Sequence, residues 1–533
     1  MAVFVAGLVA VIIFYLVVLI VGIWAAWRNR LRGSQQEQNE RIMVGGRDIG
    51  IIVGSFTFTG TFVGGGYING TAESLYSPEY GLLWTHAPLG SFLCVIVGGL
   101  FFAKKMRAQG YTTMLDPFQC KFGKRMGGLL FLPALCGDLF WSASVLAALG
   151  GTLSVVIDLD IRISVIVSAC IAILYTLIGG LYSVAYTDVV QTLCIFFGLW
   201  FCVPFAFVNP AVLDAGEEFA RNNTRSWLGT CNPENIGALL DSLLLVVFGS
   251  LPWQDYFQRV LSTDSPKHAQ VVSFISAFGI LILAIPPALI GAVAINADWN
   301  MTGYGDVSPL EKGESALILP IVLRYLTPPA VSVIGLGAIA AAVMSSIDSS
   351  ILSASSLFTR NVYKLAIRQQ ASQKELTWVM RITLFFVGAL STTFALAVGS
   401  VYKLWYLASD IVYVVIFPQL VCVLYFDVNT YGSFLAYLLA IILRLGGGEP
   451  VFNLEPFIHY PGGTNFPFKT FSMLMSLVTL IAVSYAVKFL FVNGILAKKY
   501  DFLGCKLAEE GRTIHIKEID KIGYNAEKEK LHG

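Results

Sequence analysis

Apolar runs of about twenty residues recur along almost the whole chain, and this feature constrains the fold more than any other. An α-helix crosses the hydrocarbon of a bilayer in about 20 residues. We place thirteen spans, at residues 3–27, 48–72, 80–103, 125–157, 163–181, 184–208, 237–259, 270–297, 331–360, 377–398, 402–426, 431–447 and 469–494. Charged residues make up only 13% of the 533 residues, against about 25% in soluble proteins. The sequence therefore predicts an all-α polytopic membrane protein.

The sequence contains no motif of the common enzyme or nucleotide-driven classes. No HExxH motif, no zinc-binding spacing of Cys and His and no Walker A loop occurs in the chain, although each would be readable from a short stretch. The net charge is +1, and no basic domain suggests binding of nucleic acid. We therefore expect a protein that is not an enzyme and needs no cofactor.

The distribution of basic residues predicts how the chain is threaded through the membrane. Cytoplasmic loops of membrane proteins carry an excess of Lys and Arg. The more basic segments are 28–47, 104–124, 260–269 and 361–376, and the less basic ones are 209–236 and 298–330. We therefore place the N-terminus outside and the C-terminus in the cytoplasm.

This threading assigns the two ends of the chain and two glycosylation sites. Residues 1–27 become a leading transmembrane helix, and residues 498–533 become a cytoplasmic tail. Asn222 and Asn300 begin N-x-Ser/Thr sequons in segments that the threading places outside, so we expect both to be glycosylated.

Two spans have sequences that suit a helix interior poorly. FTFTGTFVGGGYING, at residues 56–70, contains five glycines, and FGSLPWQDYF, at 248–257, contains Pro252, which cannot continue the hydrogen-bond ladder. Irregular backbone at membrane depth persists only where it lines a cavity or is buried in protein. For either span alone, close packing of helices at glycine is the alternative.

The positions of the two breaks predict the domain organisation. Broken helices in matching positions of two repeats mark a binding site near the middle of the membrane. We predict two inverted five-helix repeats, at residues 45–210 and 237–427, each opened by a broken helix. Two C-terminal transmembrane helices follow within residues 428–497.

One helical face of the span 331–360 carries a row of hydroxyl groups. Ala342, Ser345 and Ser346 follow the i, i+3, i+4 spacing, and Ser349 and Ser353 continue the same face. Serine in a membrane helix often bonds only the carbonyl one turn back, which is the alternative for one or two of them. Sodium is a hard cation that takes oxygen ligands, so a whole face of hydroxyls predicts coordination of an ion.

Among the carboxylates inside apolar spans, Asp188 and Asp348 lie next to the hydroxyl-rich segments. An ionisable residue within a membrane segment is costly and is a functional hypothesis by default. We therefore interpret both as candidates for ion binding or for a proton relay, with a purely structural role as the alternative.

Six stretches together resemble the sodium/solute symporter family: VGGRDIG, GGGYINGTAE, TMLDPFQ, GGLYSVAYTDVVQ, PWQDYFQRV and MSSIDSSILSASS. Within that family the chain is most similar to the branch that carries choline with high affinity. The resemblance implies a LeuT-like core and alternating access, coupled to sodium and dependent on chloride. It also implies uptake of choline across the plasma membrane for acetylcholine synthesis, in synaptic terminals and their vesicles.

The resemblance also implies positions for the coupling ions. The implied sodium ligands are the carbonyls of Thr59, Phe62 and Ala342 and the hydroxyls of Ser345 and Ser346. A second ion position, found in some members of the family, would involve Asp188 with Ser346 and Ser349. No residue is assigned to chloride.

An aromatic cage suits a quaternary ammonium ion, because such a cation has no N–H donor and is attracted to ring faces. The candidates for this cage are Phe62, Trp141, Trp253 and Trp405; for a single tryptophan, a place at the membrane interface is the alternative. Phe62 stands where choline carriers have Trp, and Ser91 stands where they have Tyr. Both departures weaken the attraction of the aromatic cage for choline, so a related methylammonium compound is an alternative cargo.

Two further readings of function stay open at this point. A channel, or a sensor that kept the fold without transporting, is the alternative from another class of protein. A carrier of another small organic solute, such as a sugar, an amino acid or a monocarboxylate, is the alternative within the family.

Overall fold

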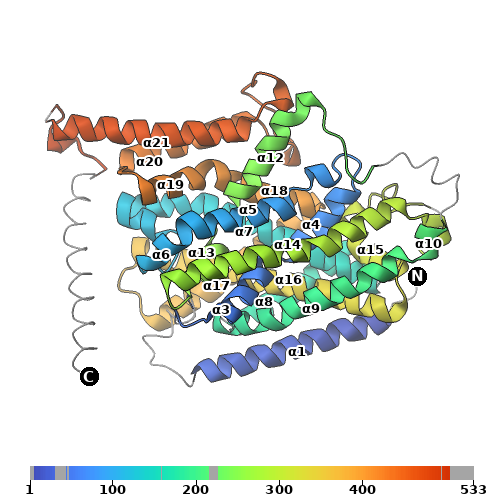
Figure 1. The fold of residues 1–533 in the computed structure, drawn as a ribbon. Helices are drawn as coiled ribbons and strands as arrows, with labels where there is room; N and C mark the ends of the chain where they lie inside the picture. The colour runs from blue at the N-terminus through green and yellow to red at the C-terminus, as the bar shows by residue number, and fades with distance from the viewer. Residues whose placement is uncertain are drawn as a thin grey trace.

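The computed structural model describes residues 5–30, 44, 47–157, 159–179, 181–214, 226–305, 307–493 and 495–503, which form a bundle of helices joined by loops (Figure 1). The longer helices are α1 (Val5–Arg30), α3 (Ile51–Phe62), α4 (Gly65–Tyr76), α5 (Ala87–Val97), α7 (Asp116–Ile157), α8 (Ile161–Gly179), α9 (Leu181–Phe207), α12 (Ile236–Gly249), α13 (Gln254–Leu261), α14 (Pro266–Asn296), α16 (Pro329–Leu357), α17 (Gln373–Val398), α18 (Val401–Ile411), α19 (Phe417–Tyr425), α20 (Thr430–Gly446) and α21 (Phe468–Val492). Shorter pieces are α6 (Lys104–Ala108), α10 (Pro210–Leu213), α15 (Ile318–Tyr325) and the π-helical segments Gly98–Ala103, Phe358–Ile367 and Val412–Ile416.

Most of the predicted spans reach membrane length. Among the described residues, nine helices are long and apolar enough to cross a bilayer, and the bent pair of α3 and α4 makes a tenth. The apolar helices at the other three predicted spans are shorter: Ile12–Gly22, Ile161–Leu174 and Thr430–Gly446. The predicted number of thirteen is therefore not confirmed. Boundaries also differ: α7, for example, begins at Asp116 rather than at residue 125, with a kink at Gly123 (φ 83°).

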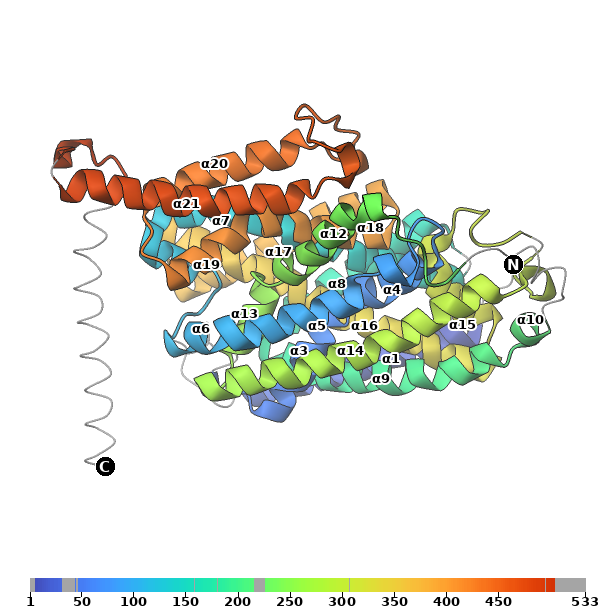
Figure 2. The same cartoon turned by 45° about the horizontal axis from the view of Figure 1, so that its top comes forward.

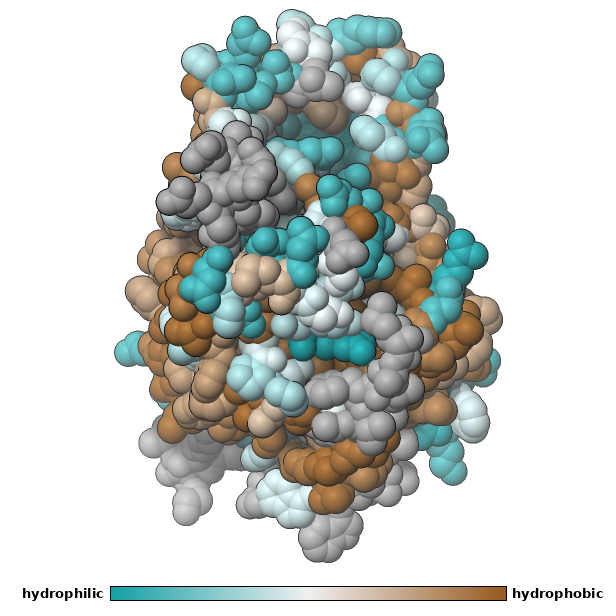
Figure 3. Space-filling view, turned by 90° about the vertical axis from the view of Figure 1, so that its right-hand side faces the viewer, coloured by the Kyte–Doolittle hydropathy of each residue, from teal (hydrophilic) through white to brown (hydrophobic). Residues whose placement is uncertain are grey.

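The surface of the bundle has the polarity of a membrane protein. Large apolar side chains such as Ile52, Phe197 and Phe386 are 74%, 65% and 60% exposed. Figure 3 looks onto the end of the bundle that lies at the right of Figure 1, with hydrophilic residues over its middle and hydrophobic residues along its flanks. An apolar belt beside a polar end is the pattern that a bilayer requires of a membrane-spanning bundle.

The first predicted break is confirmed, since α3 and α4 meet at an angle of 47°. Gly64, between them, has extended backbone (φ −91°, ψ 179°). A Cβ atom at Gly64 would collide with the side chain of Ser346 in α16 and would lie 3.5 Å from a ring atom of Trp141 in α7. Glycine is therefore required here for a close approach, and the broken backbone is buried in protein.

The second predicted break is confirmed at residues 250–253, between α12 and α13. The backbone N–H of Trp253 donates to Leu251 (2.9 Å), so it leaves the carbonyl of Gly249 without its helical partner. The indole N–H of Trp253 donates to that carbonyl instead, at 2.7 Å. A carbonyl in hydrocarbon needs such a partner, so the side chain that faces the break also stabilises it.

Buried ion pairs between side chains attach the two C-terminal helices to the bundle. α20 and α21 lie side by side along one flank (Figures 1 and 2). Arg444 of α20 donates to both carboxylate oxygens of Asp410 in α18, at 2.7 and 2.6 Å. The ammonium group of Lys469, at the start of α21, lies 2.8 Å from the same carboxylate. A bidentate pair fixes geometry as well as adding energy, so α20 and α21 are tied to α18.

Candidate functional site

A cavity lies where the two broken helices approach each other, and it brings together all four aromatic residues that the sequence predicted for a cage. The space between its atoms is about 400 Å³, open solvent included, of which the centre of a water molecule can reach about 30 Å³. The aromatic residues that line it are Phe62, Tyr67, Trp141, Trp253 and Trp405. The predicted residues come from the two breaks and from α7 and α18, and Tyr67 of α4 is an addition that the sequence analysis missed.

The rings around the cavity are held by their neighbours. Trp141 and Trp253 meet edge to face, with ring centroids 6.0 Å apart. Trp405 stacks on Tyr402 at 5.9 Å, and Phe62 stacks on Phe58 at 5.2 Å. Such contacts stabilise ring positions beyond simple burial, so a neighbouring ring helps to fix each of these side chains.

Polar groups complete the lining: Thr61, Ser91, Ser250, Asp255 and Ser409. Ser91, which the family resemblance set in the place of a tyrosine, therefore does face the cavity. Asp255, in the first turn of α13, was part of a motif noted in the sequence but was not predicted as a site residue.

A buried carboxylate positions the helix that carries Trp405. Glu73 of α4 accepts hydrogen bonds from the hydroxyl of Ser400 (2.6 Å) and from the backbone N–H of Tyr402 (2.9 Å). These groups lie at the N-terminus of α18, where a negative charge is favourable because of the helix dipole. Glu73 therefore joins the second half of the first broken helix to α18.

The structure brings the predicted sodium ligands into one neighbourhood. The hydroxyl of Ser346 donates to the carbonyls of Ala342 (3.1 Å) and Thr61 (3.4 Å). A Cβ atom on Gly60 would lie 3.1 Å from the hydroxyl oxygen of Ser345. Both hydroxyls therefore face the turn of α3 that contains Thr59 and Phe62, whereas the carbonyl of Thr59 still accepts its helical bond from Val63 at 2.8 Å. Coordination of sodium by these groups stays a prediction.

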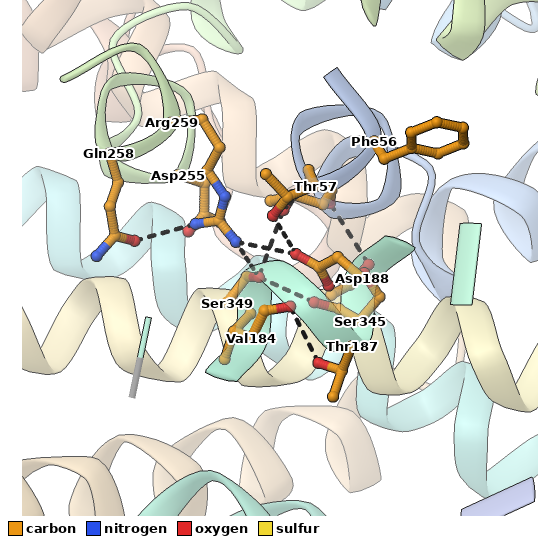
Figure 4. Close-up of polar contacts among 12 residues, drawn as sticks. Phe56, Thr57, Val184, Thr187, Asp188, Asp255, Gln258, Arg259, Ser345 and Ser349 are labelled. Carbon is orange, nitrogen blue, oxygen red and sulfur yellow. Dashed lines mark hydrogen bonds and ion pairs between the residues drawn. The ribbon is translucent and has the colours of Figure 1, made fainter. Parts of the chain in front are cut away.

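Asp188 of α9 forms the centre of a buried polar cluster next to the predicted sodium site (Figure 4). Its two carboxylate oxygens accept hydrogen bonds from Thr57 of α3 and Ser345 of α16, each at 2.5 Å. The guanidinium of Arg259, on α13, lies 3.5 Å from the carboxylate and donates to the hydroxyl of Ser349 at 2.5 Å. Asp188 thus links α3, the first half of the first broken helix, and α13, the second half of the second, to α16.

Arg259 is the most important residue that the sequence analysis missed. It is 1% exposed, and its side chain contacts Asp188 and Ser349, two of the three residues predicted for a second ion. The rule that selected Asp188, that an ionisable residue inside a membrane span is functional by default, applies equally to Arg259. In this conformation a guanidinium occupies the surroundings expected for a second ion.

The serine face is buried and partly explained by local bonding. Ser346, Ser349 and Ser350 donate to the carbonyls one turn back, as the structural alternative expected. Ser345 and Ser353 instead donate to carboxylates of other helices, Asp188 and Asp255. The hydroxyl face is therefore both a packing surface and a polar contact surface.

Asp348 differs from Asp188 in its surroundings. Its side chain is fully buried, and neither carboxylate oxygen has a hydrogen-bond partner among the described residues. The structure therefore places Asp348 beside the cluster but does not join it to the predicted ligands.

The predicted glycosylation sites lie apart from the cavity. Asn300 is exposed in the loop between α14 and α15, and Asn222 lies outside the described residues. Glycosylation of either stays a prediction.

A bundle of membrane-spanning helices with two broken helices around a central cavity defines a transporter rather than an enzyme. The sequence profile of the Sodium:solute symporter family matches residues 42–440, and the chain belongs to this family. It is 57% identical over 533 residues to the High affinity choline transporter 1 of Homo sapiens, covering 97% of this chain and 92% of that protein. It is 53% identical over 509 residues to the High-affinity choline transporter 1 of Drosophila melanogaster, covering 94% and 81%.

A solved structure of a Na⁺-coupled sialic acid symporter has the same fold. The likeness covers 90% of this chain and 97% of that one, with a TM-score of 0.69 at 17% identity. The predicted fold class, an all-α polytopic protein with a LeuT-like core of two inverted repeats, is confirmed, whereas the boundaries of the repeats stay a prediction.

Proposed function

We propose that this chain takes up choline, or a close quaternary ammonium ion, together with sodium by alternating access. The observation that carries the proposal is the cavity formed by Phe62, Trp141, Trp253 and Trp405 beside the predicted sodium ligands. A quaternary ammonium ion offers no N–H, and each ring face in contact with it contributes about 2 kcal/mol when the contact is desolvated. Relatives that carry the name of choline transporters are 50–57% identical to this chain, which supports the same cargo.

Sodium would act at the junction of the first break and α16. The carbonyls of Thr59, Phe62 and Ala342 and the hydroxyls of Ser345 and Ser346 would hold the ion and brace α3 against α16. Because the substrate cavity shares Phe62 with this site, bound sodium would also order one wall of the cavity. Binding of sodium and binding of the organic cation would then favour the same state, which is the thermodynamic requirement for coupling.

The membrane potential would drive this transport. Each positive charge that moves inward gains about 2.3 kcal/mol per 100 mV of inside-negative potential. A choline ion and one sodium ion carry two such charges. The potential alone would therefore supply useful work before any sodium gradient is counted.

The finer parts of the proposal follow from the family resemblance. We expect dependence on chloride, location in the plasma membrane with the N-terminus outside and the C-terminus in the cytoplasm, and glycosylation at Asn222 and Asn300. We also expect a role in supplying choline for acetylcholine synthesis in synaptic terminals and their vesicles.

Uptake of radiolabelled choline tests the proposal. Cells that express the chain should accumulate choline above its external concentration in sodium medium and not in lithium medium, and replacement of chloride by gluconate should reduce uptake. Betaine, carnitine and glucose serve as competitors that separate a quaternary-ammonium site from other cargo. Entry that does not depend on sodium and stops at equilibrium with the membrane potential would instead indicate a channel, and no uptake would indicate a sensor.

A further inference from the structure

Asp255 is the one charged residue among the described residues that line the aromatic cavity. Aromatic rings alone suffice to attract a quaternary ammonium ion. A carboxylate at the same cavity adds a full negative charge and an acceptor for hydrogen bonds, which rings do not supply. The lining therefore contains more than a cage for a cation without N–H groups requires.

The carboxylate of Asp255 is held at the cavity by the local structure. Asp255 lies in the first turn of α13, directly after the break at Pro252 and Trp253, and a negative charge is favourable at a helix N-terminus. The hydroxyl of Ser353 in α16 donates a hydrogen bond to one of its carboxylate oxygens. The side chain is thus oriented from two elements.

The charge of Asp255 is not neutralised by a direct ion pair in the part of the chain that the structure describes. Arg259 lies one turn further along α13 and attracts Asp255 electrostatically, but its guanidinium makes its direct contacts with Asp188, Ser349 and Gln258. Asp138 of α7 lines a smaller cavity that shares Trp253 with the aromatic one, and one of its carboxylate oxygens is buried without a partner. Asp138 adds a second acid close enough to interact electrostatically with Asp255. Burial and mutual repulsion both disfavour two charged carboxylates here, so a bound cation would stabilise their charged forms.

We propose that Asp255 is the counter-ion of the ammonium group in the cavity, and that it extends the substrate class from quaternary ammonium ions to protonated amines that carry an N–H. This inference rests on the proposed function of the cavity. A quaternary ion gains only charge attraction from the carboxylate. A protonated tertiary amine also gains a charge-assisted hydrogen bond, which is among the strongest in proteins.

Competition between two amines tests this inference. N,N-dimethylethanolamine lacks one methyl group of choline and is protonated at neutral pH, so it carries the N–H that choline lacks. We expect it to inhibit radiolabelled choline uptake at a concentration within about tenfold of the choline KM, because one hydrogen bond to a charged group offsets the lost methyl contact. Inhibition more than about tenfold weaker in the wild-type protein would overturn the inference.

Substitution of Asp255 gives the second measurement. Asp255→Asn should raise the inhibition constant of N,N-dimethylethanolamine about tenfold more than it raises the choline KM, since the amide keeps the shape and removes the charge. Ser355→Ala, which loses only a bond to the carbonyl one turn back in α16, is the control and should leave the ratio of the two constants unchanged. Equal changes of both constants in Asp255→Asn would overturn the inference.

The two proposals fail in different ways. Sodium-dependent uptake of choline by the wild-type protein reports on the proposed function. The ratio of the two constants reports on Asp255 alone, and the wild-type ratio remains decisive if Asp255→Asn does not reach the cell surface.

Discussion

The ion pair between Asp188 and Arg259 makes a quantitative prediction about stability. Both side chains are buried, and the carboxylate oxygen lies 3.5 Å from the guanidinium nitrogen. We consider Asp188→Leu, Arg259→Met and the double variant, which replace each charged group by an apolar one of similar volume. Each single variant leaves one buried charge without its partner, and the double variant leaves none.

The distance sets the expected magnitude. Two unit charges at 3.5 Å interact by about 5 kcal/mol at an effective dielectric constant of about 20, and removal of one member of a buried pair typically costs about 3–5 kcal/mol. Asp188→Leu also removes the acceptor of two hydroxyl groups, Thr57 and Ser345. We therefore expect it to destabilise the protein at least as much as Arg259→Met, and the double variant to be more stable than the sum of the single effects by about 3 kcal/mol or more.

The assay is denaturant titration of the purified transporter in mixed micelles, with tryptophan fluorescence as the signal. The exposed pair of Asp427 and Lys488 provides a matched cycle, in which coupling of only about 0.2–1 kcal/mol is expected. If the effects of Asp188→Leu and Arg259→Met add to within about 0.5 kcal/mol, the buried charges do not act as a pair and the reasoning is wrong.

Three further predictions concern the sites themselves. Ser345→Ala should lower the apparent sodium affinity of uptake about tenfold, the equivalent of one lost bond to a charged group. Ser355→Ala, which loses only a bond to the carbonyl one turn back, should leave the sodium affinity unchanged. Unchanged sodium dependence of Ser345→Ala would contradict its assignment to the sodium site. Trp253→Ala should weaken choline binding by about thirtyfold or more, the equivalent of about 2 kcal/mol. The side chain of Trp378 on α17 is 62% exposed, so Trp378→Ala should leave binding unchanged. If Trp253→Ala retains its affinity for choline, Trp253 does not belong to the cage. Phe62→Trp should lower the choline KM several-fold because Trp is the stronger cation–π partner, and an unchanged or higher KM in surface-expressed protein would argue against contact with the ammonium group.

Parts of the site were predictable because a local pattern carried the information. Glycine at Gly64 and proline at Pro252 predicted the two breaks, since each residue acts on its own backbone. The i, i+3, i+4 spacing predicted that Ser345 and Ser346 share a face, because helical geometry alone decides it. The aromatic candidates Trp141 and Trp253 required the family resemblance in addition. In sequence alone, a tryptophan of a cage cannot be told from a tryptophan at the membrane interface.

The contacts between distant segments were not predictable in this way. Asp188 is separated by 131 residues from Thr57 and by 157 residues from Ser345, and no local pattern connects them. The sequence shows that Arg259 is a charge in a membrane span, but its ion pair with Asp188 depends on how α13 packs against α9 and α16. The direction of Asp255 towards the cavity likewise depends on the angle at which α13 resumes after the break.

The sequence by itself determined the class of the protein, the two interrupted helices and the hydroxyl face of α16. These properties follow from hydropathy, from the dihedral limits of glycine and proline, and from the helical repeat, all of which act within a few residues. Only the tertiary structure decided that Tyr67 and Asp255 join the predicted rings in one cavity, and which buried cation neutralises which acid. Those outcomes depend on packing between helices, because in a medium without water each charge must find its partner on another segment of the chain.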